Sequence, residues 1–475
     1  MKKITKILKR KFKNFNPKLK EECGVFGISD NQDASTLSTL GLHALQHRGQ
    51  EGAGIACTDE IKIYSEKGIG LVSDIFDKDK INKLHGNSAI GHVRYSTSGS
   101  KNLVNVQPIC VTSSAGEMAI AHNGNLTNAN KLKAKLENNG AIFQTNSDTE
   151  VIIHLISNSK KRKFVDRVIY ALGKCEGAFS LLFITKDGII AARDPKGFRP
   201  LMLGNINNSY VIASETCAFD LVEAEPIREI KPGEVLEINH KGITSHNPFP
   251  NQRKKSFCIF EHIYFARPDS NIFGSSVYMT RKELGRQLAR EHPVKADYVV
   301  PVPDSGVASA IGYSEESKIP LELGLLRNHY VGRTFIEPQQ HIRNFGVKLK
   351  LNSVKDVLKN KKVIVIDDSI VRGTTCRKII KMIKDAGAKE VHVRISSPPT
   401  KDSCYYGIDT PDKTELIAND LSTEQIRRYI LADTLGYLTL NGLRNSVQKN
   451  SSYNVKNNFC VSCFNSRYPT DIELS

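Results

Sequence analysis

The chain has 475 residues, 40% of them hydrophobic and 25% charged, and its formal net charge is +17 at pH 7. This length favours about two to four domains with large cores. No apolar run approaches the roughly 18 residues that a membrane-spanning helix requires. Residues 1–22 contribute +7 of the charge, and no basic motif interleaved with aromatic residues follows them. We therefore expect neither a membrane nor a nucleic acid as a partner.

The first 22 residues form a basic leader with nine Lys or Arg residues and two Glu residues. The leader lacks the apolar core and the small-residue cleavage site of a secretory signal, and it is rich in Lys rather than in Ser and Arg. A transit peptide is therefore not favoured, and we expect a cytoplasmic protein. The ten cysteines of such a chain argue against disulfides.

Short strands and Gly turns alternate from Cys23 to about Asn247, with a few helical patterns between them. The predicted strands are Gly54–Cys57, Ile61–Tyr64, Ala89–Arg94, Met118–Ala121, Phe179–Ile184, Gly188–Ala192, Tyr210–Ala213 and Glu234–Ile238. The predicted helices are Ala34–Gln46, Asn128–Leu136, Asp148–Ser157 and Phe164–Leu172. Many antiparallel strands with few helices predict an α+β sandwich of layers.

Cys23 stands at the start of this half and is a candidate nucleophile. A lone Cys on a strand is more often a small core residue. If processing removes residues 1–22, however, Cys23 carries a free α-amino group, whose usual pKa is about 7.7–8.0. An amine of that basicity can accept the thiol proton, so that one residue supplies both the nucleophile and the base.

A stretch at 246–255 that is rich in Pro and charge predicts a linker to a second half. In that half, Val363–Ile366 are four β-branched residues in a row, which predict a strand buried on both faces of a parallel sheet. The strand ends on Asp367 and Asp368, and a polar turn then leads into a helical pattern. The apolar positions of this pattern are Cys376, Ile379, Ile380 and Ile383.

A strand, a polar turn and a helix start together form an anion site, because free backbone N–H groups and the helix dipole converge there. Asp367 and Asp368 suit a ligand that carries hydroxyls or a metal beside its phosphate, such as a ribose phosphate. The sequence has neither a Walker A loop nor a GxGxxG loop at this point. The alternative is a core strand with a capped helix, and two adjacent acids at a buried strand end make that arrangement costly.

This stretch resembles the phosphoribosylpyrophosphate (PRPP) loop of type I phosphoribosyltransferases. The resemblance implies an α/β domain with a central, mainly parallel sheet. It also implies that Asp367 and Asp368 hold the ribose hydroxyls. The turn residues that would bind the rest of PRPP are Ser369, Arg372, Gly373, Thr374 and Thr375.

Val299–Gly306 is similar to the pyrophosphate-binding loop of the same family. The resemblance implies that Ser305, Asp367 and Asp368 lie around a Mg²⁺ ion that accompanies the diphosphate. Because Mg²⁺ keeps several of its waters, few protein ligands are expected. The alternative for Ser305 is a simple turn hydroxyl.

Leu325–Lys350 has poor periodicity and is long for a loop, which indicates a functional segment. It resembles the flexible loop that closes over PRPP in the phosphoribosyltransferases. Within it, Arg333 and Lys348 are the predicted contacts of the diphosphate.

Five segments of the first half resemble, in order, segments of the glutaminase domain of class II amidotransferases. They are Cys23–Ile28, Leu45–Gly52, Gly91–Thr97, Ala121–Asn125 and Asn146–Glu150. The resemblance covers nearly all of residues 23–240, and it implies an N-terminal-nucleophile (Ntn) fold with αββα layers.

By this resemblance, Cys23 attacks the side-chain amide of glutamine. The side chain of Asn123 and the backbone N–H of Gly124 form the oxyanion hole. Arg94 binds the carboxylate of glutamine and Asp148 binds its α-amino group, since a zwitterion needs one guanidinium and one acid. A surface ion pair is the alternative for Arg94 and Asp148.

Some cysteines and histidines of the chain are candidate metal ligands by residue type. Cys460 and Cys463 form the only CxxC pair, and alone they would predict a redox pair or structural thiols rather than a zinc ribbon, which needs a second close pair. The histidines of the first half show no spacing suited to a metal triad, and we expect them to be structural. They are His43, His47, His92, His122 and His154.

Cys258–Ser270 resembles a signature of the amidophosphoribosyltransferase family, so that the resemblance spans Cys23 to about Pro469. It implies a basic propeptide at 1–22 that is removed, a glutaminase domain at 23–250, and a phosphoribosyltransferase domain with a cluster-binding segment at 257–475. The ligands of a [4Fe–4S] cluster, as in some family members, would be Cys258, Cys404, Cys460 and Cys463. The cysteines that match nothing and are expected to be buried are Cys57, Cys110, Cys175, Cys217 and Cys376.

The family implies an enzyme that converts glutamine, PRPP and water into 5-phosphoribosylamine, diphosphate and glutamate, the committing step of purine synthesis. It also implies a homotetramer with purine nucleotides as feedback inhibitors. One alternative is another class II amidotransferase, such as a glucosamine-phosphate synthase, against which the Asp367-Asp368 pair argues. The other is a non-catalytic regulator that senses PRPP. The intact set Cys23, Arg94, Asn123 and Asp148 argues against it.

Overall fold

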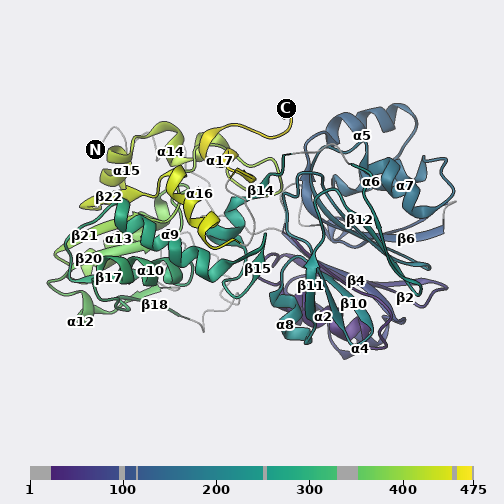
Figure 1. Cartoon of the computed structure of the whole chain (residues 1–475), viewed down its shortest axis with the longest axis horizontal. Helices are drawn as coiled ribbons and strands as arrows, with labels where there is room; N and C mark the ends of the chain where they lie inside the picture. Colours follow the sequence, from purple (N-terminus) through teal and green to yellow (C-terminus); the bar gives the residue numbers. More distant parts are fainter. Residues whose placement is uncertain are drawn as a thin grey trace.

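The computed structural model describes residues 23–95, 102–113, 116–249, 254–328, 351–451 and 457–472. Figure 1 shows two bodies side by side. The amino-terminal half, residues 23–249, consists of two stacked sheets with helices on their outer faces, and the carboxy-terminal half, residues 254–472, contains one central sheet between helices.

The first sheet of the amino-terminal half has seven antiparallel strands. In spatial order they are β11 (Glu225–Glu229), β9 (Met202–Ile206), β10 (Ser209–Ala213), β1 (Gly24–Ile28), β4 (Ser88–Arg94), β2 (Gly52–Thr58) and β3 (Ile63–Ile69). The second sheet has six antiparallel strands. They are β13 (Gly242–His246), β12 (Val235–Asn239), β8 (Gly188–Arg193), β7 (Gly177–Thr185), β6 (Gly116–Leu126) and β5 (Ile109–Ser113).

The alternation of side chains along β1 accounts for the layers. Val25 packs between the two sheets with Ile90 and Leu182, whereas Phe26 and its period-two partner Ile28 face the helices outside the first sheet. All five residues of β1 are buried, because the strand lies at the centre of its sheet with neighbours on both sides. This central position fixes the residue that precedes the strand, Cys23.

Helices cover the outer face of each sheet (Figure 1). Those on the side of the first sheet are α2 (Ala34–Ala44), α3 (Val72–Ile75), α4 (Lys78–Asn82) and α8 (Cys217–Val222). Those on the second sheet are α5 (Ala129–Asn138), α6 (Thr149–Ser157) and α7 (Phe164–Leu172). The layers are therefore αββα, as predicted, and a short 3-10 turn, η1 (Leu103–Asn105), completes this half.

The predicted elements of this half correspond closely to the observed ones, with one clear error of position. The four predicted helices are present as α2, α5, α6 and α7, and seven of the eight predicted strands lie within or beside observed ones. The strand predicted from Ile61 starts only at Ile63, because residues 59–62 form the turn between β2 and β3 and leave Ile61 86% exposed. Strands β1, β5, β9, β11 and β13 were not among the predicted strands.

The sheet of the carboxy-terminal half is parallel throughout. Its strands, in spatial order, are β17 (Tyr298–Pro301), β20 (Lys362–Asp367), β21 (Glu390–Ile395) and β22 (Thr434–Tyr437). The helices on one side are α9 (Val277–Glu291), α10 (Val307–Ser317) and α16 (Leu440–Lys449), and those on the other are α13 (Thr374–Asp385) and α15 (Thr423–Ile430).

Strand β20 is buried on both faces, as its run of β-branched residues predicted. Val363 and Val365 pack toward α13 and α15, whereas Ile364 and Ile366 pack toward α9 and α10. On α13, the buried residues are the four predicted ones, Cys376, Ile379, Ile380 and Ile383.

Short elements connect the halves and border the sites. They are β14 (Phe257–Cys258), the π-helical turn η2 (Glu261–Phe265), β15 (Asn271–Ile272), β16 (Ser275–Ser276), β18 (Leu325–Arg327), β19 (Leu351–Ser353), α12 (Lys355–Leu358), η4 (Lys413–Glu415), α14 (Ile417–Asp420), β23 (Phe459–Cys460) and α17 (Ser462–Asn465). Strands β18 and β19 pair at the base of the predicted PRPP loop. Arg333 and Lys348, within that loop, and the leader 1–22 lie outside the described residues.

The fold class predicted from the sequence is thus confirmed: an αββα body followed by an α/β body with a parallel sheet. Within the described part of the chain, no helix has both the length and the apolar character that a membrane crossing requires.

Candidate functional sites

A cavity in the amino-terminal half brings together four of the five residues predicted for the glutaminase site. Its lining residues are Cys23, Arg94, Tyr95, Asn105, Gln107, His122, Gly124, Ser147 and Asp148. The fifth predicted residue, Asn123, is buried beside it, and its Nδ2 donates to Ser214 Oγ at 3.4 Å. The segments that supply these residues lie far apart in the sequence, which is typical of a binding site.

Strands β1 and β4 place the first two residues of the cavity. Gly24 on β1 pairs with Val93 on β4, so that Cys23 and Arg94 lie at neighbouring strand ends. The Cys23 thiol donates to the carbonyl oxygen of Tyr95 at a sulfur–oxygen distance of 3.6 Å. Arg94 is only 6% exposed, so that a carboxylate in this cavity would meet a largely desolvated guanidinium.

Asp148 stands at the N-terminal end of α6 and is held in its charged form. Its Oδ2 accepts a hydrogen bond of 2.8 Å from Leu126 N, and its Oδ1 lies 3.5 Å from His122 Nδ1. Burial opposes ionisation, but His122 and the backbone N–H groups outweigh it and hold the pKa of Asp148 below its usual value. A carboxylate in this position suits an ammonium group of a ligand.

His122 and Gln107 were not predicted as site residues, although both line the cavity. The His122 ring contacts Thr149 Oγ1 at 3.1 Å and Asp148, and its backbone N–H donates to Gln107 Oε1 at 2.7 Å. His122 is therefore the structural histidine that the sequence predicted, but it also orients Asp148. His122 lies in the Ala121–Asn125 motif, so the sequence could have identified it as a site residue. No sequence pattern pointed to Gln107.

Residue 124 has a backbone conformation that only glycine adopts without strain. Its φ is +152°, and a Cβ atom there would lie 2.1 Å from the carbonyl oxygen of Ala178 on the neighbouring strand β7. The close approach of β7 thus fixes the Gly124 peptide at the edge of the cavity.

The second predicted site lies where β17 and β20 end, because the carboxyl ends of parallel strands meet at one edge of the sheet. Asp367 is the last residue of β20 and Asp368 follows it. Ser305, four residues after the end of β17, has its Oγ 3.5 Å from Asp367 Oδ1. The structure therefore brings together the three residues predicted around Mg²⁺.

Burial disfavours the charge of both acids, and Asp368 further disfavours the charge of Asp367. Burial, followed by the charge of Asp368, holds the pKa of Asp367 well above its usual value. Burial likewise raises the pKa of Asp368, opposed in part by hydrogen bonds from Ser369 and Ser305 and then by Arg281. Arg281 is itself buried and donates to the carbonyl oxygens of His262 and Ala266. Such a pair favours a ligand that brings a cation or hydroxyl donors.

The turn after the acids leads into α13 through Gly373, whose φ is +75°. Thr374 and Thr375 are the first residues of α13, so their backbone N–H groups belong to the unbonded first turn of the helix. Ser369 donates a hydrogen bond to Asp368. Arg372 pairs with Glu415 at 2.7 Å, so its guanidinium already has an acidic partner at the rim of the turn.

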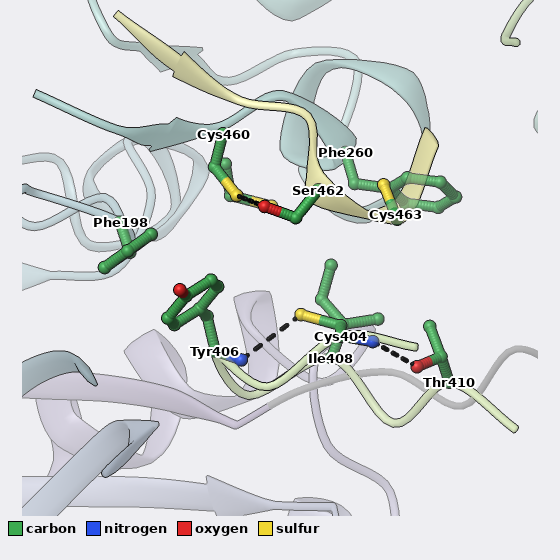
Figure 2. Close-up of a pocket in the computed structure, with 10 residues that line it drawn as sticks. Phe198, Phe260, Cys404, Tyr406, Ile408, Thr410, Cys460, Ser462 and Cys463 are labelled. Carbon is green, nitrogen blue, oxygen red and sulfur yellow. Dashed lines mark hydrogen bonds between the residues drawn. The ribbon is translucent and has the colours of Figure 1, made fainter. Parts of the chain in front are cut away.

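A second cavity is lined by the four predicted cluster cysteines (Figure 2). The full lining is Phe198, Cys258, Phe260, Cys404, Tyr406, Ile408, Thr410, Cys460, Ser462 and Cys463. Cys258 on β14 pairs in register with Cys460 on β23. In Figure 2, Cys460 and Cys463 lie on one side of the cavity and Cys404 faces them from the other.

The side chains that line this cavity suit a positively charged group whose ligands are cysteine sulfurs. Burial, followed by the nearby Cys460, Cys258 and Cys404, holds the pKa of the Cys463 thiol well above its usual value. The backbone N–H of Tyr406 donates to Cys404 Sγ at 3.3 Å, which is a contact of the kind that tunes iron–sulfur clusters. Among the described residues, no three His, Cys, Asp or Glu side chains converge as ligands of a single ion.

The other cysteines correspond only partly to expectation. Cys57, Cys217 and Cys376 are buried, as predicted, whereas Cys175 is half-buried. The prediction for Cys110 was wrong: it is exposed, because β5 is the edge strand of its sheet and turns alternate residues to solvent.

Comparison with known proteins covers both halves. Residues 92–220 match a protein-family model described as a glutamine amidotransferase domain, and residues 276–421 match one described as a phosphoribosyl transferase domain. The chain is 52% identical over 468 residues to the chloroplastic amidophosphoribosyltransferase of Glycine max. This alignment covers 97% of this chain and 80% of that relative. It is 50% identical over 456 residues to the amidophosphoribosyltransferase of Bacillus subtilis, covering 96% of this chain and 95% of the relative.

Two solved structures have the same fold. One, described as the allosteric regulatory enzyme of purine biosynthesis, superposes with a TM-score of 0.90 at 50% identity and covers 95% of this chain and 97% of its own. The other is the glutamine PRPP amidotransferase of B. subtilis complexed with ADP and GMP, with a TM-score of 0.90 at 49% identity, covering 95% of this chain and 98% of its own. The similarity therefore extends over both halves of the chain.

Proposed function

Because this chain belongs to the amidophosphoribosyltransferase family, we propose that it converts glutamine, PRPP and water into 5-phospho-β-D-ribosylamine, diphosphate and glutamate. This is the first committed step of purine biosynthesis. The observation that carries the proposal is that one chain holds two sites of complementary chemistry. A thiol, a guanidinium and a carboxylate share one cavity, and a pair of acids ends a strand beside a phosphate-type turn in the other half.

Ammonia is released in the amino-terminal half. The Cys23 thiolate attacks the side-chain carbonyl of glutamine, ammonia leaves, and water then releases glutamate from the thioester. Asn123 and Gly124 donate hydrogen bonds to the oxyanion, each worth about 3 kcal/mol. Arg94 and Asp148 hold the carboxylate and the ammonium group of the substrate. Removal of residues 1–22 gives Cys23 the α-amino group that accepts its thiol proton.

Ammonia then passes to the carboxy-terminal half, where it displaces diphosphate from the anomeric carbon of PRPP. Asp367 and Asp368 hold the ribose hydroxyls, and the turn residues hold the rest of PRPP. These turn residues are Ser369, Arg372, Gly373, Thr374 and Thr375. We also assign diphosphate contacts to Arg333 and Lys348, which lie outside the described residues.

Ser305, Asp367 and Asp368 would hold Mg²⁺, since their hard oxygen atoms converge at the strand ends. Bound there, Mg²⁺ would neutralise charge on the leaving diphosphate. The protein itself orients the ribose against the incoming ammonia, because both acids are fixed by the buried end of β20.

Cys258, Cys404, Cys460 and Cys463 would hold a [4Fe–4S] cluster. Such a cluster would link β14, β23, α17 and the loop at residue 404, which are separate segments of the carboxy-terminal half. The fit rests on four thiols in one cavity and on burial, followed by the other three thiols, which together raise the pKa of Cys463.

We propose three further properties, of which the domains and the nucleotide inhibition are supported by the relatives and the homotetramer by the resemblance to the family alone. The chain has a glutaminase domain at 23–250 and a phosphoribosyltransferase domain at 257–475, and it forms a homotetramer. Purine nucleotides inhibit it, since the B. subtilis relative was solved with ADP and GMP. We expect a cytoplasmic location, although several plant relatives are named as chloroplastic, and imaging of a fluorescent fusion of the full chain would test it.

The two-site assignment is tested by separating the half-reactions. Cys23→Ala should abolish the use of glutamine but keep synthesis from added ammonium salt at high pH. Asp367→Asn should suppress product from both nitrogen sources while basal glutamine hydrolysis continues. The loss of transfer should exceed the roughly 1.5–3 kcal/mol of one charged hydrogen bond, because the acid positions both ribose and metal. Loss of ammonia-dependent synthesis in a folded Cys23→Ala enzyme would contradict the proposal.

A further inference from the structure

A short segment of the carboxy-terminal half, residues 404–407, lies against the amino-terminal half beside the glutaminase cavity. The carbonyl oxygen of Tyr405 accepts a hydrogen bond of 3.0 Å from Asn125 Nδ2, on strand β6. The carbonyl oxygen of Tyr406 accepts two more from the buried Arg199, at 3.2 and 3.0 Å. The backbone of this segment is therefore bonded directly to the amino-terminal half.

Packing and internal hydrogen bonds hold the segment firmly. The ring of Tyr406 stacks on Phe198 with centroids 4.0 Å apart and planes inclined by 17°. The backbone N–H of Cys404 donates to Thr410 Oγ1 at 2.6 Å, which closes the loop on itself. A backbone fixed by these contacts can act as a rigid support for what lies next to it.

The next residue, Gly407, lies directly against Gly124. A Cβ atom on Gly407 would stand 3.0 Å from the carbonyl carbon of Gly124 and 3.1 Å from its Cα. From β7, the carbonyl oxygen of Ala178 approaches the position of a Gly124 Cβ to 2.1 Å. Gly124 is thus confined between β7 and Gly407, and of these two glycines only Gly124 lines the glutaminase cavity.

We propose that Gly407 is a positioning residue of the glutaminase site, which fixes the Gly124 peptide so that its N–H points at the oxyanion. The inference rests on the proposed function, in which Gly124 is an oxyanion donor. Such a donor must lie about 2.7–3.1 Å from the oxyanion, so a displacement of a few tenths of an ångström weakens it. The half of the chain that binds PRPP therefore completes the site that releases ammonia.

Gly407→Ala tests this directly, because the added methyl group would press on the main chain of Gly124. Residue 407 has a φ of +104°, so the substitution also carries a local backbone cost. Gly242→Ala is the matched control: Gly242 has the same φ of +104° at the first residue of β13, and a Cβ atom there would have no neighbour within 4 Å.

We expect Gly407→Ala to lower kcat for glutamine hydrolysis by about 10-fold or more, approaching the ~10²–10³-fold that loss of a whole donor costs. The KM for glutamine should change by less than about twofold, because Arg94 and Asp148 bind the substrate. Ammonia-dependent synthesis should be unchanged, and so should the rate at which iodoacetamide alkylates Cys23, followed by mass spectrometry, since the thiol is not displaced. Gly242→Ala should leave all four quantities unchanged.

A second variant covers the case in which Gly407→Ala fails to fold and loses ammonia-dependent synthesis as well. Asn125→Ala removes the hydrogen bond to Tyr405 without crowding Gly124, and it should lower kcat for glutamine with KM unchanged. Asn123→Ala, measured in parallel, reports on the oxyanion hole itself. If Asn123→Ala lowers kcat while folded Gly407→Ala and Asn125→Ala do not, the inference is overturned and the proposed function stands. Full activity of Asn123→Ala would overturn both.

Discussion

Glu261 of the carboxy-terminal half holds Arg48 of the amino-terminal half by two hydrogen bonds, of 2.7 and 3.0 Å. Arg48 in turn donates from Nε to the carbonyl oxygen of Cys23 at 3.3 Å. Glu261 also accepts a hydrogen bond of 3.0 Å from Arg199, and Glu215 contacts Arg48 from the amino-terminal half. All four charged side chains are buried. The candidate nucleophile is therefore tied to the second half through a shared carboxylate.

The first prediction concerns the pair of Glu261 and Arg48. Glu261→Gln should lower the free energy of unfolding by about 3–5 kcal/mol, because it removes a buried carboxylate and leaves two guanidinium charges undercompensated. In the folded enzyme, glutamine hydrolysis should fall more than ammonia-dependent synthesis, since Arg48 contacts Cys23. Urea unfolding and the two activity assays measure these effects.

An exposed acid provides the control for that substitution. Glu424 is 53% exposed and pairs with Arg427 and Arg428 at 2.7 and 2.8 Å. Because ion pairs between exposed side chains contribute little to stability, Glu424→Gln should leave the free energy of unfolding almost unchanged. If the two variants unfold at the same urea concentration, the buried Glu261–Arg48 pair does not make the contribution to the free energy of unfolding that is predicted for it.

The second prediction concerns the leader. N-terminal sequencing and intact mass of the active enzyme should show Cys23 as the first residue, because the α-amino group is needed as the base. A gene that encodes Met directly before Cys23 should give an enzyme of equal activity once that Met is removed. An active enzyme that still begins at Met1 would show that the amine is not the base.

The third prediction concerns the cysteine cavity. Protein purified without oxygen should be brown and contain about four irons per chain. Cys463→Ser should lose iron and stability, because the other three thiols all lie close enough to Cys463 to raise its pKa. Cys175→Ser is the control, since Cys175 is also only half-buried but lies outside this cavity. Stable, active protein without iron, or with zinc in its place, would refute the cluster.

Local signals were sufficient to predict much of the second site. The run Val363–Ile366 predicted the buried strand β20, and the two acids and the polar turn after it predicted a site at the strand end. Helix α13 buries the same four residues that its apolar spacing indicated. These features depend on neighbours in the sequence, which is why the pattern alone could identify them.

Contacts between distant segments could not be predicted in this way. Glu261 and Arg48 are 213 residues apart, and Gly407 meets Gly124 only because one loop of the second half packs on β6. Whether Cys110 is exposed depends on β5 being an edge strand, which follows from the order of strands in the sheet rather than from the sequence of β5 itself. Such facts require the tertiary structure.

The last prediction concerns the pH dependence of stability and rests on His262, next to Glu261. The side chain is fully buried between the rings of Phe273 and Phe459, and within the described structure neither ring nitrogen has a hydrogen-bond partner. Burial, followed by the charge of Arg281, lowers the pKa of His262 to about 3, although Glu261 acts in the opposite direction.

Because the unfolded chain binds this proton at a pKa of about 6.5 and the folded chain does not, the protein should lose stability as the pH falls below that value. His262 should contribute roughly 1 kcal/mol of this loss between pH 6.5 and 5.5, because the unfolded chain is already half protonated at pH 6.5. His262→Leu, which is close in volume and cannot be protonated, should remove that part, as urea unfolding at the two pH values would show. The exposed His43→Leu should keep the full dependence. Equal slopes in the His262→Leu and His43→Leu variants would mean that His262 is not held neutral by the fold.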